Sequence, residues 1–167
     1  MAKRFQAEMH FDVAPDEVFA AQSDPHYVVW KHEHMAAFDV SASAEEVGDH
    51  VVISSSRRLP AEVPSMAKRF VGESILVEEV HDWAPPAADG SRHGVVTASF
   101  GPAPMSVDGT LDLRPDGAGS VLEVVINSRA NVPLVSGKLE GLVGDQFMRA
   151  LEVEQRIAPR WFEDDSA

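Results

Sequence analysis

Arg57, Glu79 and His81 are the side chains of this chain whose types and spacing are best suited to binding or proton transfer. Arg57 lies two residues beyond Ser55 in an alternating segment, so it is expected on the same strand face as Ile53. Glu79 and His81 share a face of a second alternating segment in the same way. A buried unpaired charge is costly, so these groups must pair, reach water or meet a ligand. One interpretation is a polar spot that orients a ligand inside an apolar cavity. The alternatives are a plain Arg–Glu pair and strand ends that emerge into solvent.

The histidines do not have the spacing of a metal site. His32 and His34 are two residues apart, and such positions point to different faces of a helix. The His-Glu-x-x-His spacing of metalloproteases is absent, and so is a Gly-x-Ser-x-Gly elbow. The chain has no cysteine, which removes disulfides, thiolate nucleophiles and thiolate metal ligands together. We therefore expect no metal and no cofactor, and no residue is assigned a catalytic role.

The charge balance bears on the partners. Lys and Arg total 14 against 27 Asp and Glu, which gives a formal net charge of −13. A field of that sign repels nucleic-acid backbones and anionic membrane surfaces. The basic residues Lys3 and Arg4 precede strand-like alternation instead of an apolar signal core. No apolar run approaches the roughly 20 residues of a membrane span. We expect a cytoplasmic protein with no nucleic-acid partner and no membrane span.

The length fits one domain. A chain of 167 residues with 44% apolar residues is sufficient for a single packed core. No linker, repeat or low-complexity segment divides the chain. We therefore predict one domain over residues 1–167, with a disordered tail over residues 162–167.

The first elements are a strand and two short helices. The segment Phe5–Phe11 alternates with a period of two, which predicts a strand with one buried face. Pro15 with the following acids opens a first helix. Asp24 as N-cap and Pro25 at the first helical position open a second.

A series of strands follows the two helices. Turn signals rich in Gly, Pro and Asp separate them, and such close turns imply an antiparallel meander. The predicted strands are Phe38–Ala44, His50–Arg58, Ser74–Trp83, Val95–Phe100, Ser106–Leu113 and Val121–Ala130.

The chain then changes to helical periodicity. Apolar residues recur at helical spacing from about Val135 to Ala158, which predicts a helix about 36 Å long. A helix of that length crosses a whole sheet. Gly137, Gly141 and Gly144 fall on one of its faces. They allow either a close approach of the helix to the sheet or open volume for a ligand beneath it, and both can hold at once.

Nearly the whole chain resembles a known superfamily. The resemblance is carried by Met1-Ala2-Lys3-Arg4-Phe5, Lys68-Arg69-Phe70-Val71-Gly72, Trp83-Ala84-Pro85, Gly109-Thr110, Val132-Pro133-Leu134-Val135, Gly137-Lys138-Leu139-Glu140, Ala150-Leu151-Glu152-x-Glu154 and Trp161. With the order of elements, these residues resemble the START-like superfamily of polyketide cyclases and lipid-transfer domains, and within it a bacterial domain-of-unknown-function family. The resemblance implies an α+β helix-grip fold, in which a seven-stranded curved antiparallel sheet wraps around a long C-terminal helix. It also implies a cavity that commonly binds lipids, polyketides or other apolar molecules.

The function expected from these observations is binding or transport of an apolar small molecule, such as a lipid, a polyketide or an isoprenoid-like compound. The alternatives are a cyclase or aromatase that uses polar cavity residues, and a protein-interaction module without a ligand. The segment 64–71 is either a lid or a loop packed on the core. The oligomeric state stays open. The residues expected to bind the ligand are Trp30, Ile53, Arg57, Met66, Phe70, Val77, Glu79, His81, Leu139, Val143 and Phe147.

Overall fold

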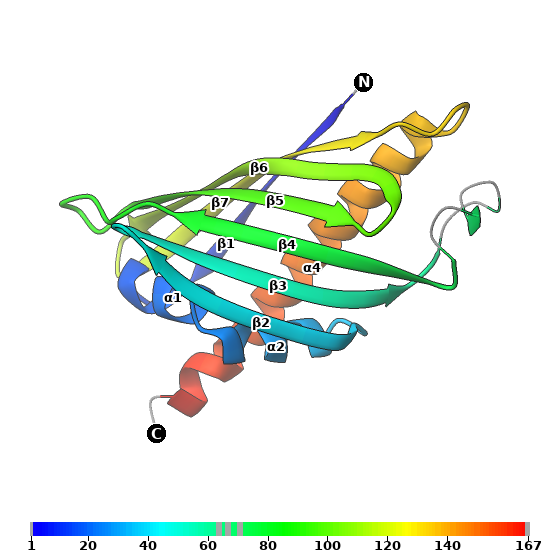
Figure 1. Ribbon diagram of the computed structural model, residues 1–167. Coiled ribbons are helices and arrows are strands. Elements are labelled where there is room, and N and C mark those ends of the chain that lie inside the picture. The colour runs from blue at the N-terminus through cyan, green and yellow to red at the C-terminus, as the bar shows by residue number, and fades with distance from the viewer. Residues whose placement is uncertain (1, 63–64, 66–67, 70–71, 166–167) are drawn as a thin grey trace.

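The computed structural model describes residues 2–62, 65, 68–69 and 72–165, and within them one antiparallel sheet curves around a long helix (Figure 1). The strands lie in the order β1-β7-β6-β5-β4-β3-β2. This arrangement confirms the predicted helix-grip fold. The elements are β1 (Lys3–Phe11), α1 (Pro15–Gln22), α2 (Pro25–Glu33), β2 (Phe38–Val47), β3 (His50–Pro60), β4 (Ser74–Trp83), β5 (Arg92–Phe100), β6 (Ala103–Asp116), β7 (Gly119–Ala130) and α4 (Ser136–Asp165).

The two short helices begin where the sequence predicts. Pro15 and Pro25 occupy the first turns of α1 and α2, where a missing backbone N–H costs nothing. The side chain of Asp24 accepts a hydrogen bond of 2.9 Å from the backbone N–H of His26, as an N-cap should. These helices follow β1 directly (Figure 1), and Lys31 and His32 of α2 belong to the lining of the cavity described below.

Helix α4 extends further than the sequence suggests. We expected it to end near Ala158 and residues 162–167 to be disordered, but the helix continues through Pro159 to Asp165. Trp161 packs against Tyr27 with ring centroids 5.3 Å apart, and Phe162 meets Phe11 edge-on at 6.2 Å. These aromatic contacts compensate for the hydrogen bond that a proline removes from a helix. The rest of the expected tail, residues 166–167, lies outside the described residues.

The start of α4 crosses β1 at close range. A methyl group placed on Gly144 would overlap the ring of Phe5, so this glycine allows the helix to approach the strand. At Gly141 the nearest neighbour would be Nζ of Lys3 at 3.4 Å, and at Gly137 the space is open. Close approach to the sheet therefore accounts for Gly144.

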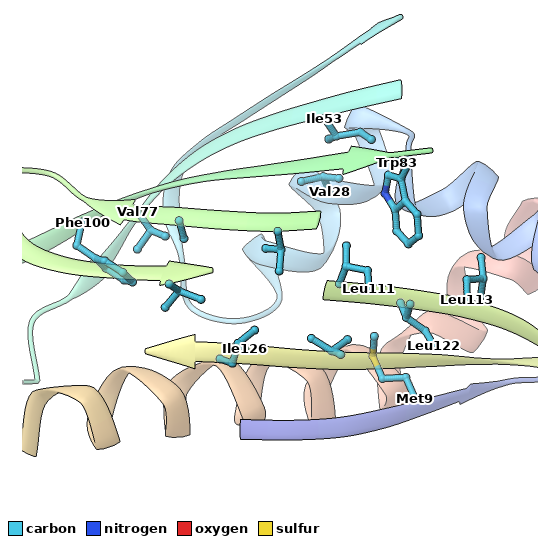
Figure 2. Close-up of a cluster of buried hydrophobic side chains, with 14 of the residues drawn as sticks. Met9, Val28, Ile53, Val77, Trp83, Phe100, Leu111, Leu113, Leu122 and Ile126 are labelled. Atoms are coloured by element: carbon cyan, nitrogen blue, oxygen red, sulfur yellow. The ribbon is translucent and has the colours of Figure 1, made fainter. Parts of the chain in front are cut away.

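The apolar core extends to the place where α1 and α2 meet the sheet. Trp83 is fully buried on β4, and its ring meets Phe19 of α1 edge-on at 5.7 Å. Figure 2 shows Val28 of α2 in the same cluster as Ile53 and Trp83. This packing fixes the two short helices against the sheet.

Candidate ligand cavity

A cavity of about 430 Å³ lies between the sheet and α4. Its volume falls in the usual range of roughly 300–1,000 Å³ for small-molecule sites. Strands supply one wall, α4 supplies another, and residues of α1, α2 and the segment after α2 complete the lining. The apolar part of the lining includes Met9, Val77, Ile126, Leu139, Val143 and Phe147.

Most of the residues expected to bind a ligand line this cavity. The strand register places those of β3 and β4 there, and the helical spacing places those of α4 opposite. The predicted residues in the lining are Arg57, Val77, Glu79, His81, Leu139, Val143 and Phe147. Ile53 instead borders a separate space of about 10 Å³, the size of one water molecule. Met66 and Phe70 lie outside the described residues.

Trp30 does not belong to the cavity lining given by the described residues. It stands three residues after Tyr27 on α2, so both rings share a helix face. That face meets the end of α4, where the ring of Trp161 lies 5.5 Å from that of Trp30. The expected place of Trp30 in the cavity is therefore corrected, because the aromatic face of α2 packs on Trp161 of α4, beyond the end that we expected for that helix near Ala158.

The polar group predicted on β3 and β4 is present in the cavity wall. Nη1 of Arg57 lies 3.5 Å from Oε2 of Glu79, and Nε2 of His81 lies 3.5 Å from the same oxygen. Arg57 and His81 therefore both contact Glu79, and all three side chains line the cavity. His81 is the most open, with 17% of its side chain exposed, against 7% for Arg57 and 9% for Glu79. We call these three residues the polar cluster.

The charge state of the polar cluster follows from its contacts. Burial by itself raises the pKa of a carboxyl group, but the charge of Arg57 and the hydrogen bond with His81 outweigh it at Glu79. The pKa of Glu79 is therefore held well below its ordinary value. Glu79 is ionised at neutral pH and balances the charge of Arg57.

Sequence reasoning missed a second buried polar group in the cavity wall. Oε1 of Glu154 on α4 lies 3.0 Å from Nζ of Lys31, and its Oε2 accepts hydrogen bonds of 2.7 Å from Tyr27 and Gln22. Burial opposes ionisation of Glu154, but Lys31 and these hydrogen bonds lower its pKa below the ordinary value. A signal was available, since Phe147, Leu151 and Glu154 follow one another at helical spacing, which places an acid on the apolar face.

His32 lies near both of these groups and borders a small space together with residues of each. It is 5% exposed, and its Nε2 has no hydrogen-bond partner among the described residues. Burial lowers the pKa of His32 to about 2, and the cations of Arg57 and Lys31 act in the same direction. Its imidazole is therefore neutral at any pH near 7. Within the described part of the chain, no group of three or more His, Asp or Glu side chains is arranged to hold a metal ion.

A comparison with known protein families shows which family this chain belongs to. The family described as "Protein of unknown function (DUF2505)" matches residues 6–162. The chain belongs to this family. An uncharacterized protein of Mycobacterium tuberculosis (strain ATCC 25618 / H37Rv) is 27% identical over 105 residues, which are 59% of this chain and 58% of that relative. The alignment thus covers less than two thirds of the curated relatives that the chain matches.

Solved structures share the fold of this DUF2505 protein. The ZhuI aromatase/cyclase from Streptomyces sp. R1128 has a TM-score of 0.60 at 14% identity, over 96% of this chain and 95% of that one. A STAR-related lipid transfer protein from Xanthomonas axonopodis has a TM-score of 0.51 at 17% identity, over 92% and 85% of the two chains. These likenesses confirm the START-like fold that the resemblance implied, and at this identity they show the fold alone.

The three glycines of α4 lie outside the described lining of the cavity. Gly137, Gly141 and Gly144 are not among the lining residues that the structure describes, so the open volume lies under the neighbouring face of α4.

None of the helices in the described ranges is long and apolar enough to cross a membrane.

Proposed function

We propose that this DUF2505 protein binds an apolar small molecule in the cavity between the sheet and α4. The observation that carries the proposal is the cavity itself, about 430 Å³ with a mainly apolar lining. A packed protein interior leaves few voids larger than a water molecule. A volume of this size has room for a small molecule, and the mainly apolar lining favours an apolar one. The names of two proteins with this fold, an aromatase/cyclase and a lipid transfer protein, are in keeping with this function.

Burial of apolar surface is the driving force in this proposal. Each Å² of apolar surface removed from water contributes roughly 25 cal/mol, from which the cost of immobilising the ligand is subtracted. Leu139, Val143 and Phe147 supply one wall from a single rigid helix. A cavity formed by regular elements is preorganised, so little binding energy is lost in ordering the protein.

No specific observation favours either of the two alternatives, the cyclase-like enzyme and the interaction module without a ligand. An interaction module without a ligand predicts a filled interior, whereas this interior is open. A cyclase-like enzyme needs an acid or a base near neutral pKa. The pKa of Glu79 is well below its ordinary value, which makes its carboxylate a weak base, and His32 stays neutral. The proposal therefore assigns binding alone to this cavity.

Filling the cavity is expected to abolish binding. The uncharged dye Nile red fluoresces more strongly in apolar surroundings, so it is a suitable probe. Val143 lines the cavity, and in a Val143→Trp protein the indole occupies the space that the dye needs. We expect the apparent Kd for Nile red to rise at least about tenfold, which corresponds to a loss of about 1.4 kcal/mol.

The matched control is Glu152→Trp, which adds the same side chain at an exposed position of the same helix, outside the lining. Its affinity for Nile red should equal that of the wild type. Circular dichroism checks that both variants fold. Equal dye binding by wild type and Val143→Trp would show that the dye does not enter the cavity, and the proposed function would then be wrong.

A further inference from the structure

The charged side chains of the cavity lining balance one another. The described residues of the lining contain three basic side chains, Lys31, Arg57 and Arg149, and three acidic ones, Glu62, Glu79 and Glu154. Two of the opposite pairs are buried and in contact, at 3.0 Å for Lys31 with Glu154 and 3.5 Å for Arg57 with Glu79. The remaining two, Arg149 and Glu62, are exposed. The inner part of the lining therefore carries no net formal charge from its basic and acidic groups.

A charged ligand end would disturb these pairs. A carboxylate that takes the guanidinium of Arg57 must displace Glu79, and Glu79 would then be a buried charge without its counter-charge, which is costly. The same holds for Lys31, because Glu154 already occupies it. An ammonium end meets the converse difficulty, since each of the two buried carboxylates of the lining is already paired with a basic side chain. The net charge of −13 on the whole chain further disfavours an anion.

An uncharged polar end finds partners without breaking a pair. The guanidinium of Arg57 has five N–H donors, and the bond to Glu79 uses only part of them. His81 is the most open member of the polar cluster and offers a ring nitrogen. A hydroxyl group both donates and accepts, so it can use both partners at once.

We propose that the ligand of this cavity is an uncharged molecule with a hydroxyl group at the end that meets Arg57 and His81, and that fatty-acid-like anions are excluded. This inference rests on the proposed function, since it names the class of molecule that the same cavity takes. It identifies Glu79 as the residue that keeps anions out, because Glu79 neutralises Arg57.

Decanol and decanoate test this inference, because they share one chain and differ in the charge of one end. Displacement of Nile red is measured at pH 8, where decanoate is ionised and an ordinary imidazole is neutral. We expect decanol to bind at least about tenfold more tightly than decanoate. Decylamine, which is cationic at this pH, should bind as weakly as decanoate.

Removing the acid should largely abolish the preference for decanol. In a Glu79→Gln protein Arg57 loses its counter-charge, so the affinity for decanoate should rise at least about tenfold relative to that for decanol. Glu78→Gln is the matched control, since Glu78 is the neighbouring acid on the exposed face of β4 and lies outside the described lining. It should leave the ratio of the two affinities unchanged.

A second measurement uses the wild-type protein alone, so it does not depend on whether a variant folds. Above the pKa of a carboxylic acid, its protonated fraction rises about tenfold for each unit by which the pH is lowered. If only the protonated acid enters the wild-type cavity, the apparent Kd of decanoate should therefore fall about tenfold per unit as the pH is lowered from 8 to 6. The Kd of decanol should stay constant over the same range.

The outcomes separate this inference from the proposed function. Decanoate that binds as tightly as decanol at pH 8, or whose Kd does not change with pH, would overturn the inference while the cavity would still bind apolar molecules. The inference also fails if Arg149→Gln abolishes tight decanoate binding, which would place an anionic end at the exposed rim. Failure of all the probes to displace bound Nile red would likewise overturn it. Absence of Nile red binding itself would remove the proposed function and this inference together.

Discussion

A Glu154→Leu protein is expected to lose about 3–5 kcal/mol of unfolding free energy, because removing one partner of a buried ion pair leaves an uncompensated charge. Glu154 is the acceptor for Lys31, Tyr27 and Gln22, which come from α1 and α2. The substitution leaves a buried ammonium and two unsatisfied hydrogen-bond donors. It therefore weakens the attachment of both short helices to α4. Urea unfolding followed by circular dichroism measures the loss.

Two further variants isolate the cause. Glu152→Leu removes an exposed acid from the same helix and should change stability by no more than about 0.5 kcal/mol. The double variant Lys31→Met with Glu154→Leu removes the stranded cation but still leaves Tyr27 and Gln22 without their acceptor. It should recover only part of the loss. If Glu154→Leu were as stable as Glu152→Leu, the buried network would not be what joins these helices.

Stability is expected to fall steadily as the pH drops from 6.5 to 5. The pKa of His32 is lowered to about 2 in the folded protein by burial, so only the unfolded chain takes up a proton in this range. A group protonated only in the unfolded state makes the unfolding free energy decrease by up to about 1.4 kcal/mol per pH unit below its unfolded pKa. The loss at pH 5 is about 2 kcal/mol relative to pH 7.5.

A His32→Gln protein should lose this slope, because glutamine does not titrate. For each protein, the unfolding free energy at lower pH is compared with that protein's own value at pH 7.5. Glu79 and Glu154, whose pKa values are lowered, contribute stability that disappears only as the pH falls below their unfolded values of roughly 4.3, outside this window. The exposed His50 has a raised pKa from its hydrogen bond with Asp82 and acts in the opposite direction in both proteins. Equal slopes in wild type and His32→Gln would contradict the assignment.

The strands and the two short helices were predictable because local patterns determine them. Alternation identified the strands, and the proline and Asp24 signals identified both short helices at their observed first residues. The register rule placed Arg57, Glu79 and His81 on one face, and all three line the cavity. A rule based on spacing succeeds here because a β-strand has a period of two regardless of its partners.

The rest depends on contacts between distant segments. The end of α4 could not be located from Pro159, because the helix is maintained by aromatic contacts with residues more than a hundred positions earlier. Trp30 was expected at the cavity and lies elsewhere for the same reason. Lys31 and Glu154 are 123 residues apart, and neither position shows its partner in the sequence. Whether Arg57 pairs or faces the cavity also required the structure, which shows that it does both.

Native mass spectrometry of the protein, after incubation with a lipid extract of the expressing cells, tests the central claim most directly. We expect a one-to-one complex with a small molecule that dissociates on activation, and no such complex for Val143→Trp. The released molecule, once extracted, should be apolar. A wild-type protein that stays at its bare mass under these conditions, or a Val143→Trp protein that still holds the small molecule, would contradict a ligand-binding cavity beneath α4.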